Sequence, residues 1–316
     1  MKFTPVLLFA AVSLSLLAGC GRSPDPAASA GSAAAAGPVI ALVPKTLNNP
    51  FFIDMQRGAE EAARAAGVTL VVQAAERETD VERQMQIIEN LIQRKVSALI
   101  LAPSGSREIV PVVLKANQAD IPVLIVDTRL DAAALQASGG KTVTFIGSDN
   151  HEGGKIAGQF AVERLGGQGR VAVLEGIAGH ETGDARVRGF REALRGHPGI
   201  TIVASQPANW ERDQGYTVFQ NILQANPTVN ALFAANDLMA LGAVEAIAAA
   251  GKTGKVTVIG FDAQDEARAA VKAGKMAATI AQNPALMGRT AVERAVALLK
   301  GEPVPADIGV SIELVK

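Results

Sequence analysis

Residues 45–52 (KTLNNPFF) place a lysine, two adjacent asparagines and two phenylalanines in one short stretch. Lys45 can donate charge-assisted hydrogen bonds, and Asn49 can both donate and accept. Phe51 and Phe52 can cover the C–H faces of a ring and exclude water. Together these side chains favour a neutral, polyhydroxylated ligand.

A strand and a helix are predicted on either side of this stretch. Residues 38–44 (PVIALVP) form a short apolar run that is typical of a buried strand. The apolar residues that follow are spaced three or four apart, as on one helix face: Phe52, Met55, Ala59, Ala62 and Ala66. Asn49 suits the N-cap, Pro50 the first turn and Gly67 the end. The stretch is thus a strand-to-helix turn, where parallel α/β sheets bind ligands.

Composition indicates a large globular protein. The chain has 316 residues, of which 48% are hydrophobic and 19% charged. This length supports a packed core and favours two domains over one. The formal net charge of -1 gives no support to nucleic-acid binding. With one cysteine, the chain forms no internal disulfide and no cysteine-based metal site.

The N-terminus has the pattern of an exported, lipid-anchored protein. Residues 1–19 combine Lys2 with an apolar run too short to span a bilayer comfortably, which predicts a secretory signal. Cys20 follows Leu-Ala-Gly and resembles the lipidation site of a lipoprotein, where several acyl chains give stable anchoring. Residues 20–37 would then be the lipidated cysteine and a flexible tether rich in Ala, Gly and Ser. We therefore expect an extracytoplasmic domain anchored to a membrane.

From residue 38 onward, short apolar runs alternate with helical patterns, which predicts parallel βαβ units. The candidate strands are 39–43, 69–73, 98–101, 123–126, 143–146, 170–174, 201–204, 231–234, 256–259 and 277–280. Helical patterns include 81–94, 182–195, 216–224 and 286–300. So many strands suit two doubly wound halves of about 120–140 residues each. Residues 128–141 are expected to have the least regular structure.

The two halves share a feature at their strand ends. Asp127 follows the strand at 123–126, and Asp262 ends the apolar run that begins at residue 256. A strand-terminal aspartate can simply start a turn or cap a helix. One such acid in each half is also what a cleft between two lobes would use.

Eight segments in order carry a family resemblance: KTLNNPFF, IPVLIVDT, GSDNHEGGKIAG, LEGIAGHETGDARVRGF, ASQPANWERDQG, LFAANDLMALGA, VIGFD and AATIAQNP. They resemble the type I periplasmic sugar-binding proteins of ABC importers, near the ribose- and allose-binding types. The resemblance implies an α/β fold of two doubly wound Rossmann-like lobes joined by a three-strand hinge. The crossings would fall near Ser148, near Gln282 and at 310–312. The first lobe would comprise 38–148 plus 283–310, and the second 149–282 plus 311–316.

The resemblance also implies a set of ligand-binding residues. The first lobe would supply Lys45, Asn49, Phe51, Phe52, Asp127 and Thr128, and the second Arg186, Trp210, Asn236, Asp262 and Gln282. Lys45 stands where ribose binders have serine, and Thr128 where they have arginine. Lys45, Asp184 with Arg186, and Trp210 bring the pocket nearer the allose type. The ligand would be a monosaccharide or polyol, and no metal or cofactor is expected.

The implied role is a monomeric receptor that delivers its ligand to the permease of an ABC importer. The alternative is a sugar sensor that docks onto a chemoreceptor or histidine kinase, which the sequence does not separate from transport. A repressor of similar fold is disfavoured, because a secretion leader stands where its DNA-binding headpiece would be.

Structural roles remain open for several of these residues. Asn49 could serve only as a helix cap, Trp210 only as packing and Gln282 only as a hinge hydrogen-bonding group. One of Phe51 and Phe52 is expected to face the cleft while the other packs, because successive helix residues point about 100° apart. Asn236 and Asp237 both suit an N-cap, so that one could cap while the other binds.

Enzymatic functions find little support. The three histidines lie in unrelated loops without metal-ligand spacing, and no serine lies in a Gly-x-Ser-x-Gly elbow. Asp127 and Asp262 could pair as in a glycosidase. We expect nearby amides and cations to keep both carboxylates ionised, which leaves no proton donor.

Overall fold

The computed structural model describes residues 37–316. The predicted signal, Cys20 and nearly all of the predicted tether lie outside the described residues. Within residues 37–316, no helix has both the length and the apolar character needed to cross a membrane.

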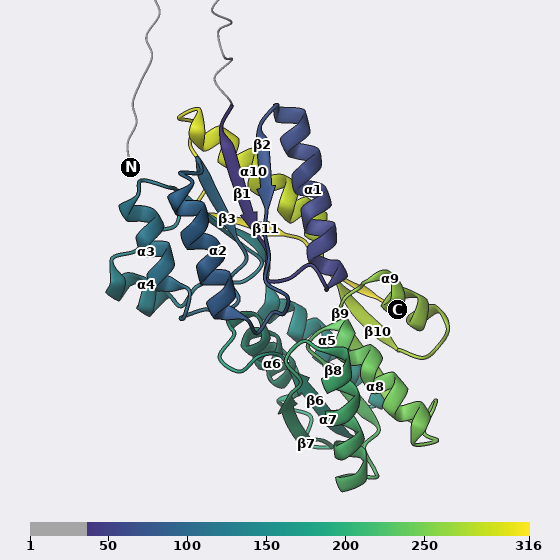
Figure 1. Ribbon diagram of the computed structural model, residues 1–316. Helices are drawn as coiled ribbons and strands as arrows, with labels where there is room; N and C mark the ends of the chain where they lie inside the picture. The colour runs from purple at the N-terminus through teal and green to yellow at the C-terminus, as the bar shows by residue number, and fades with distance from the viewer. Residues whose placement is uncertain (1–36) are drawn as a thin grey trace, which may run out of the picture. The chain divides into compact units, whose positions relative to one another are not determined.

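Two six-stranded sheets form the framework of two lobes (Figure 1). The first has the strand order β11-β5-β4-β3-β1-β2 and the second β12-β10-β9-β8-β6-β7. Neighbouring strands are parallel except for β12, which runs antiparallel to β10 at the edge of the second sheet. The predicted α/β fold with two doubly wound halves is confirmed.

The first sheet contains β1 (Val39–Val43), β2 (Thr69–Val72), β3 (Ala98–Leu101), β4 (Val123–Val126), β5 (Phe145–Ser148) and β11 (Asp307–Val310). Its helices are α1 (Pro50–Ala66), α2 (Val81–Gln93), α3 (Val110–Gln118), α4 (Ala132–Ser138) and α10 (Pro284–Leu299). Alternate residues of β1 enter different cores: Ile40 and Leu42 pack with α1 and α10, and Ala41 and Val43 with α2 and α3. The buried sheet therefore has a helical layer on each face (Figure 1).

The second sheet contains β6 (Gly169–Glu175), β7 (Ile200–Pro207), β8 (Ala231–Ala234), β9 (Thr257–Asp262), β10 (Ala278–Ala281) and β12 (Glu313–Val315). Its helices are α5 (Asn150–Leu165), α6 (Glu181–Leu194), α7 (Arg212–Ala225), α8 (Asp237–Ala249) and α9 (Asp265–Lys272). Residues of α5 and α6 pack on one face, and those of α7, α8 and α9 on the other.

The chain passes between the sheets three times: from β5 to α5, from β10 to α10 and from β11 to β12. All ten predicted strands overlap observed strands. The strands β11 (DIGV) and β12 (ELV) were not predicted, because each is short, contains an acidic residue and has no apolar run. The expectation of irregular structure at 128–141 is wrong for 132–138, which form α4. No residue of α4 is buried, so it has no apolar periodicity to detect; Asp131 and Gly139 cap it.

Close helix packing holds α6, which carries Arg186, against α5. A β-carbon on Gly154 of α5 would overlap the carbonyl oxygen of Arg186, and one on Gly189 of α6 would overlap that of His151. The two backbones can therefore approach this closely only because both positions are glycine. Helices α1 and α10 approach each other in the same way, with Gly58 against the carbonyl oxygen of Ala285 and Gly288 against that of Met55.

We predict that Gly154→Ala destabilises the protein by about 1–3 kcal/mol, because the added methyl group must push α5 and α6 apart. Differential scanning calorimetry should show a melting temperature several degrees lower. Gly309→Ala is the matched control, since a β-carbon there meets open space. Equal melting temperatures for the two variants would contradict this account of the α5–α6 contact.

Candidate functional site

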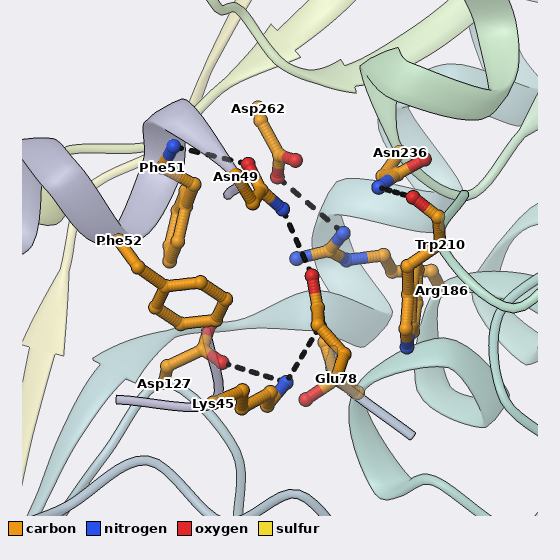
Figure 2. Close-up of a pocket in the computed structure, with 11 residues that line it drawn as sticks. Lys45, Asn49, Phe51, Phe52, Glu78, Asp127, Arg186, Trp210, Asn236 and Asp262 are labelled. Carbon is orange, nitrogen blue, oxygen red and sulfur yellow. Dashed lines mark hydrogen bonds and ion pairs between the residues drawn. The ribbon is translucent and has the colours of Figure 1, made fainter. Parts of the chain in front are cut away.

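A cavity with about 270 Å³ of empty space lies where the carboxyl ends of the two sheets face each other (Figure 2). Strand ends and helix starts of both lobes supply its walls. The lining residues are Lys45, Asn49, Phe51, Phe52, Glu78, Asp127, Thr182, Arg186, Trp210, Asn236 and Asp262. Nine of them are residues that the family resemblance singled out. Whether they contact a ligand stays a prediction.

Two predicted site residues do not line the cavity but contact residues that do. Thr128 is fully buried and donates to Asp127 Oδ2 at 2.9 Å. Gln282 donates through Nε2 to Asp262 Oδ1 at 2.8 Å. Each therefore orients a lining carboxylate. Glu78 and Thr182 line the cavity although sequence reasoning did not select them.

Lys45 is buried between two carboxylates. Its Nζ lies 3.1 Å from Asp127 Oδ2 and 3.7 Å from Glu78 Oε2. The same ammonium lies 5.5 Å from the centre of the Phe52 ring. A buried ammonium is stable only when its charge is compensated, and these two acids compensate it.

Asn49 combines a capping role with contacts to other cavity residues. Its Oδ1 accepts from the backbone N–H of Phe51 at 3.0 Å and from Gln264 Nε2 of the second lobe at 2.9 Å. Its Nδ2 donates to Glu78 Oε1 at 2.9 Å. The capping alternative is therefore true, but it is not the whole role of Asn49. One amide hydrogen remains for another acceptor.

Both Phe51 and Phe52 line the cavity and both belong to the core of the first lobe. Their rings meet edge to face, with centroids 5.2 Å apart and an interplanar angle of 86°. Both rings thus combine a place at the cavity wall with core packing, whereas one was expected to face the cleft squarely and the other to be partly packed. The perpendicular arrangement lets each ring present part of its surface to the cavity while the rest packs.

Arg186 projects from α6 to the middle of the cavity (Figure 2). Its Nε donates to Asn150 Oδ1 at 2.8 Å, and its Nη1 donates to the carbonyl oxygen of Ala235 at 2.7 Å. Nη1 also lies 3.5 Å from Asp262 Oδ1. The guanidinium carbon stands 3.7 Å from the centre of the Phe261 ring. These contacts fix the guanidinium plane, so that its remaining N–H groups have a defined direction.

Asn236 and Asp237 take different roles from those weighed in the sequence analysis. Asn236 both caps α8, accepting from Met239 N at 2.9 Å, and lines the cavity. Its Nδ2 donates to the carbonyl oxygen of Trp210 at 3.1 Å. Asp237 neither caps α8 nor lines the cavity. It accepts hydrogen bonds from Thr279 Oγ1 at 2.7 Å and from the backbone N–H of Gln264 at 2.8 Å.

The carboxyl groups of the site titrate differently. Burial by itself would raise the pKa of Asp127, but Lys45 and Arg186 outweigh it and lower the pKa below the usual value. Burial raises the pKa of Asp262 to about 7, against the opposing effect of Arg186. Burial also raises the pKa of Glu78, against the charge of Lys45. The expectation that both aspartates stay ionised therefore fits Asp127 but not Asp262, which is more deeply desolvated than its partners can offset.

Three residues with strained backbone line the cavity. Asp127, Trp210 and Asp262 have φ angles of 64°, 68° and 113°, in the left-handed region that non-glycine residues rarely adopt. All three line the cavity. Such strain persists only where surrounding contacts enforce it, and it is typical of functional sites.

The lobes meet directly around the cavity. Besides the Gln264–Asn49 bond, the hydroxyls of Thr128 and Thr182 lie 2.8 Å apart, and the backbone N–H of Glu181 donates to Ser106 Oγ at 3.1 Å. His180 is buried at the same junction, and neither ring nitrogen has a hydrogen-bond partner within residues 37–316. Burial, with a smaller effect from Lys45, lowers the pKa of His180 to about 3. The described arrangement is thus a closed cleft.

Comparison with known proteins identifies the family that has this architecture. The family model described as periplasmic binding protein domain matches residues 40–303. The chain is 40% identical over 277 residues to the D-allose-binding periplasmic protein of Escherichia coli, covering 87% of this chain and 89% of the relative. It is 42% identical over 276 residues to the ribose import binding protein of the same organism, covering 87% and 90%.

A solved structure has the same fold and a similar sequence. An ABC transporter periplasmic solute binding protein from Actinobacillus succinogenes with bound D-allose superimposes with a TM-score of 0.84 and 43% identity, covering 88% of this chain and 97% of that one. These relatives are named as binding proteins, and the chain is likewise a binding protein rather than an enzyme. From its sequence, its two-lobed fold and its interlobe cavity, the chain belongs to the periplasmic binding protein family, near its ribose- and allose-binding members.

Proposed function

We propose that this protein captures a monosaccharide or polyol between its lobes and delivers it to an ABC importer. The observation that carries the proposal is the set of charged, amide and aromatic side chains that line one interlobe cavity from both lobes. Because these side chains come from both lobes, a small ligand held among them would contact both lobes.

The polar groups match a molecule with many hydroxyls. Asp127, Asp262 and Glu78 each use one carboxylate oxygen for a short bond within the protein, leaving the other oxygen to accept. Lys45, Arg186 and Asn49 retain N–H groups to donate. Because a hydroxyl both donates and accepts, adjacent hydroxyls satisfy such an alternating set. Phe51, Phe52 and Trp210 would cover the C–H faces of the ring.

The ligands bound in similar structures support this class. The Actinobacillus structure holds D-allose, and another solute binding protein, from Bacillus halodurans, holds myo-inositol at a TM-score of 0.81 and 30% identity. For this chain we propose direct contacts from the nine predicted residues that line the cavity. Thr128 and Gln282 would act by orienting Asp127 and Asp262.

Ligand binding would close the lobes by a hinge motion at the three interlobe crossings. The lobe boundaries would follow these crossings, near residues 148, 282 and 310–312. A ligand that contacts both lobes favours the closed state by the free energy of those added contacts. The direct bonds between Asn49 and Gln264 and between Thr128 and Thr182 would add to it.

We further propose that residues 1–19 direct export and that Cys20 carries the lipid anchor. The unique cysteine at the end of an apolar leader supports this. Residues 20–37 would tether the binding domain to the outer side of a membrane, within reach of the permease.

Titration calorimetry with D-allose, D-ribose and myo-inositol tests the proposed ligand class. We expect at least one to bind, and Asp262→Asn to weaken that binding roughly tenfold to a hundredfold, because the substitution replaces an acceptor oxygen with an NH2 group that cannot accept a hydrogen bond. Asparagine tolerates the positive φ at this position. Asp265→Asn, an exposed neighbour, serves as control and should bind normally. Absence of binding to these sugars and to a wider panel of pentoses and hexoses would refute the proposal.

The burial of His180 in the closed cleft predicts a pH dependence of stability. Its pKa is about 3 in the folded protein and about 6.5 when unfolded, so below pH 6.5 the unfolded chain binds a proton that the folded one does not. Stability is therefore lost as the pH falls below 6.5. From pH 6.5 to 4.5 this should cost about 2 kcal/mol more in the unmodified protein than in His180→Gln.

Urea unfolding at the two pH values measures this difference, and the opposing contribution of Asp262 cancels because both proteins contain it. His197→Gln, outside the cavity, is the control and should behave as the unmodified protein. If the unmodified protein and His180→Gln lose the same stability between the two pH values, burial does not lower the pKa of His180 as expected.

Lipidation predicts that the full chain incorporates labelled palmitate and sediments with membranes. Cys20→Ser should abolish the label and release the protein, because no other cysteine can be acylated. A labelled Cys20→Ser variant, or unlabelled protein with the native residue, would contradict the anchor.

A further inference from the structure

Glu78 stands apart from the ligand-binding residues expected from the sequence. It belongs to the loop between β2 and α2 and is only 6% exposed. We propose that Glu78 is a specificity-determining residue, whose free carboxylate oxygen accepts a hydrogen bond from one unsubstituted hydroxyl of the ligand. This inference rests on the proposed sugar-binding function and names a group that the site would demand of its ligand.

The loop holds Glu78 in place. The backbone carbonyl of Glu76 accepts from Thr46 Oγ1 at 2.9 Å and from Asn48 Nδ2 at 2.7 Å. An isolated β-bridge joins Thr46 to Ala75. The loop is thus fastened to the turn that carries Lys45 and Asn49. Glu78 consequently points at the cavity from a fixed backbone, while Glu76 is exposed.

The two oxygens of Glu78 differ in their surroundings. Oε1 accepts from Asn49 Nδ2 at 2.9 Å, whereas Oε2 has only Lys45 Nζ at 3.7 Å, beyond normal hydrogen-bonding distance. This oxygen can therefore accept another hydrogen bond, which a ligand hydroxyl in the cavity would supply. Asp127 and Asp262 also have one oxygen engaged and one free, so Glu78 adds a third acceptor of the same kind.

The position of Glu78 also limits what the ligand can carry. Glu78, Asn49 and Trp210 line the inner cavity and also a separate outer groove, whose other residues include Thr46, Asn48 and Arg77. Their side chains therefore form the partition between the two spaces, and the Asn49–Glu78 bond runs along it. A substituent on the ligand oxygen that faces Glu78 would have to displace this partition. The site should therefore reject both removal and substitution of that hydroxyl.

The competing explanation is that Glu78 only positions Lys45 and Asn49. In that case its loss would weaken every ligand to a similar extent. A direct contact instead couples Glu78 to one ligand hydroxyl, and a double-mutant cycle between protein and ligand isolates that coupling.

The test uses whichever of D-allose or D-ribose binds the unmodified protein, with its series of monodeoxy and mono-O-methyl analogues. In Glu78→Gln, the side-chain oxygen must accept the hydrogen bond from Asn49 Nδ2. The NH2 group of the glutamine then faces the cavity, so a donor replaces the acceptor. For one hydroxyl, we expect deletion to cost the unmodified protein roughly tenfold to a hundredfold in Kd. In Glu78→Gln the same deletion should cost less than about threefold, while the other deletions keep their effects.

Glu82→Gln is the matched control, because it removes an exposed glutamate of the same lobe and should reproduce the unmodified profile. If Glu78→Gln does not fold, Glu78→Asp keeps the charge, withdraws the carboxylate and should lose the same hydroxyl preference. Equal weakening of all analogues, or an unchanged profile, would overturn the inference while leaving the proposed function intact. If the unmodified protein binds no sugar, the proposed function fails, and this inference fails with it.

Discussion

The site depends on charge balance between two buried cations and the acids around them. Lys45 lies against Asp127 and Glu78, and Arg186 lies against Asp262. Burying an ammonium or a guanidinium without compensation costs several kcal/mol, so the acids must be in place when the lobes close. Because Asp127 comes from β4 and Glu78 from the loop after β2, the pairing also fixes how strands and loops of the first lobe meet.

Strained backbone is the means by which strand ends deliver these acids. Asp127 and Asp262 leave β4 and β9 with positive φ, and Trp210 adopts the same region before α7. The bonds from Thr128 and Gln282 hold the two carboxylates in these conformations. Strained backbone of this kind persists only where surrounding contacts enforce it. In the closed cleft, these contacts give the carboxyl groups of Asp127 and Asp262 a fixed orientation.

Sequence reasoning succeeded where a residue's neighbours along the chain decide its role. Apart from β2 and β7 at the sheet edges, the predicted strands are largely buried, and burial on both faces leaves a continuous apolar run in the sequence. Asn49 before Pro50 predicts a cap, which forms. The exposed helix α4 and the edge strands β11 and β12 lack that signature, so they were missed. Nine cavity residues were selected through the family resemblance, which already encodes a shared tertiary structure.

The sequence by itself determined the α/β class, the two-lobed organisation and the strand-to-helix turn at 45–52, because local periodicity and capping are written in adjacent residues. Only the tertiary structure showed that Glu78 lines the cavity while Glu76, two positions away, is exposed. It also showed that burial raises the pKa of Asp262 to about 7 and that Thr128 and Gln282 lie behind the lining residues. Burial, charge compensation and hydrogen-bond partners arise between segments far apart in the chain, so no local pattern contains them.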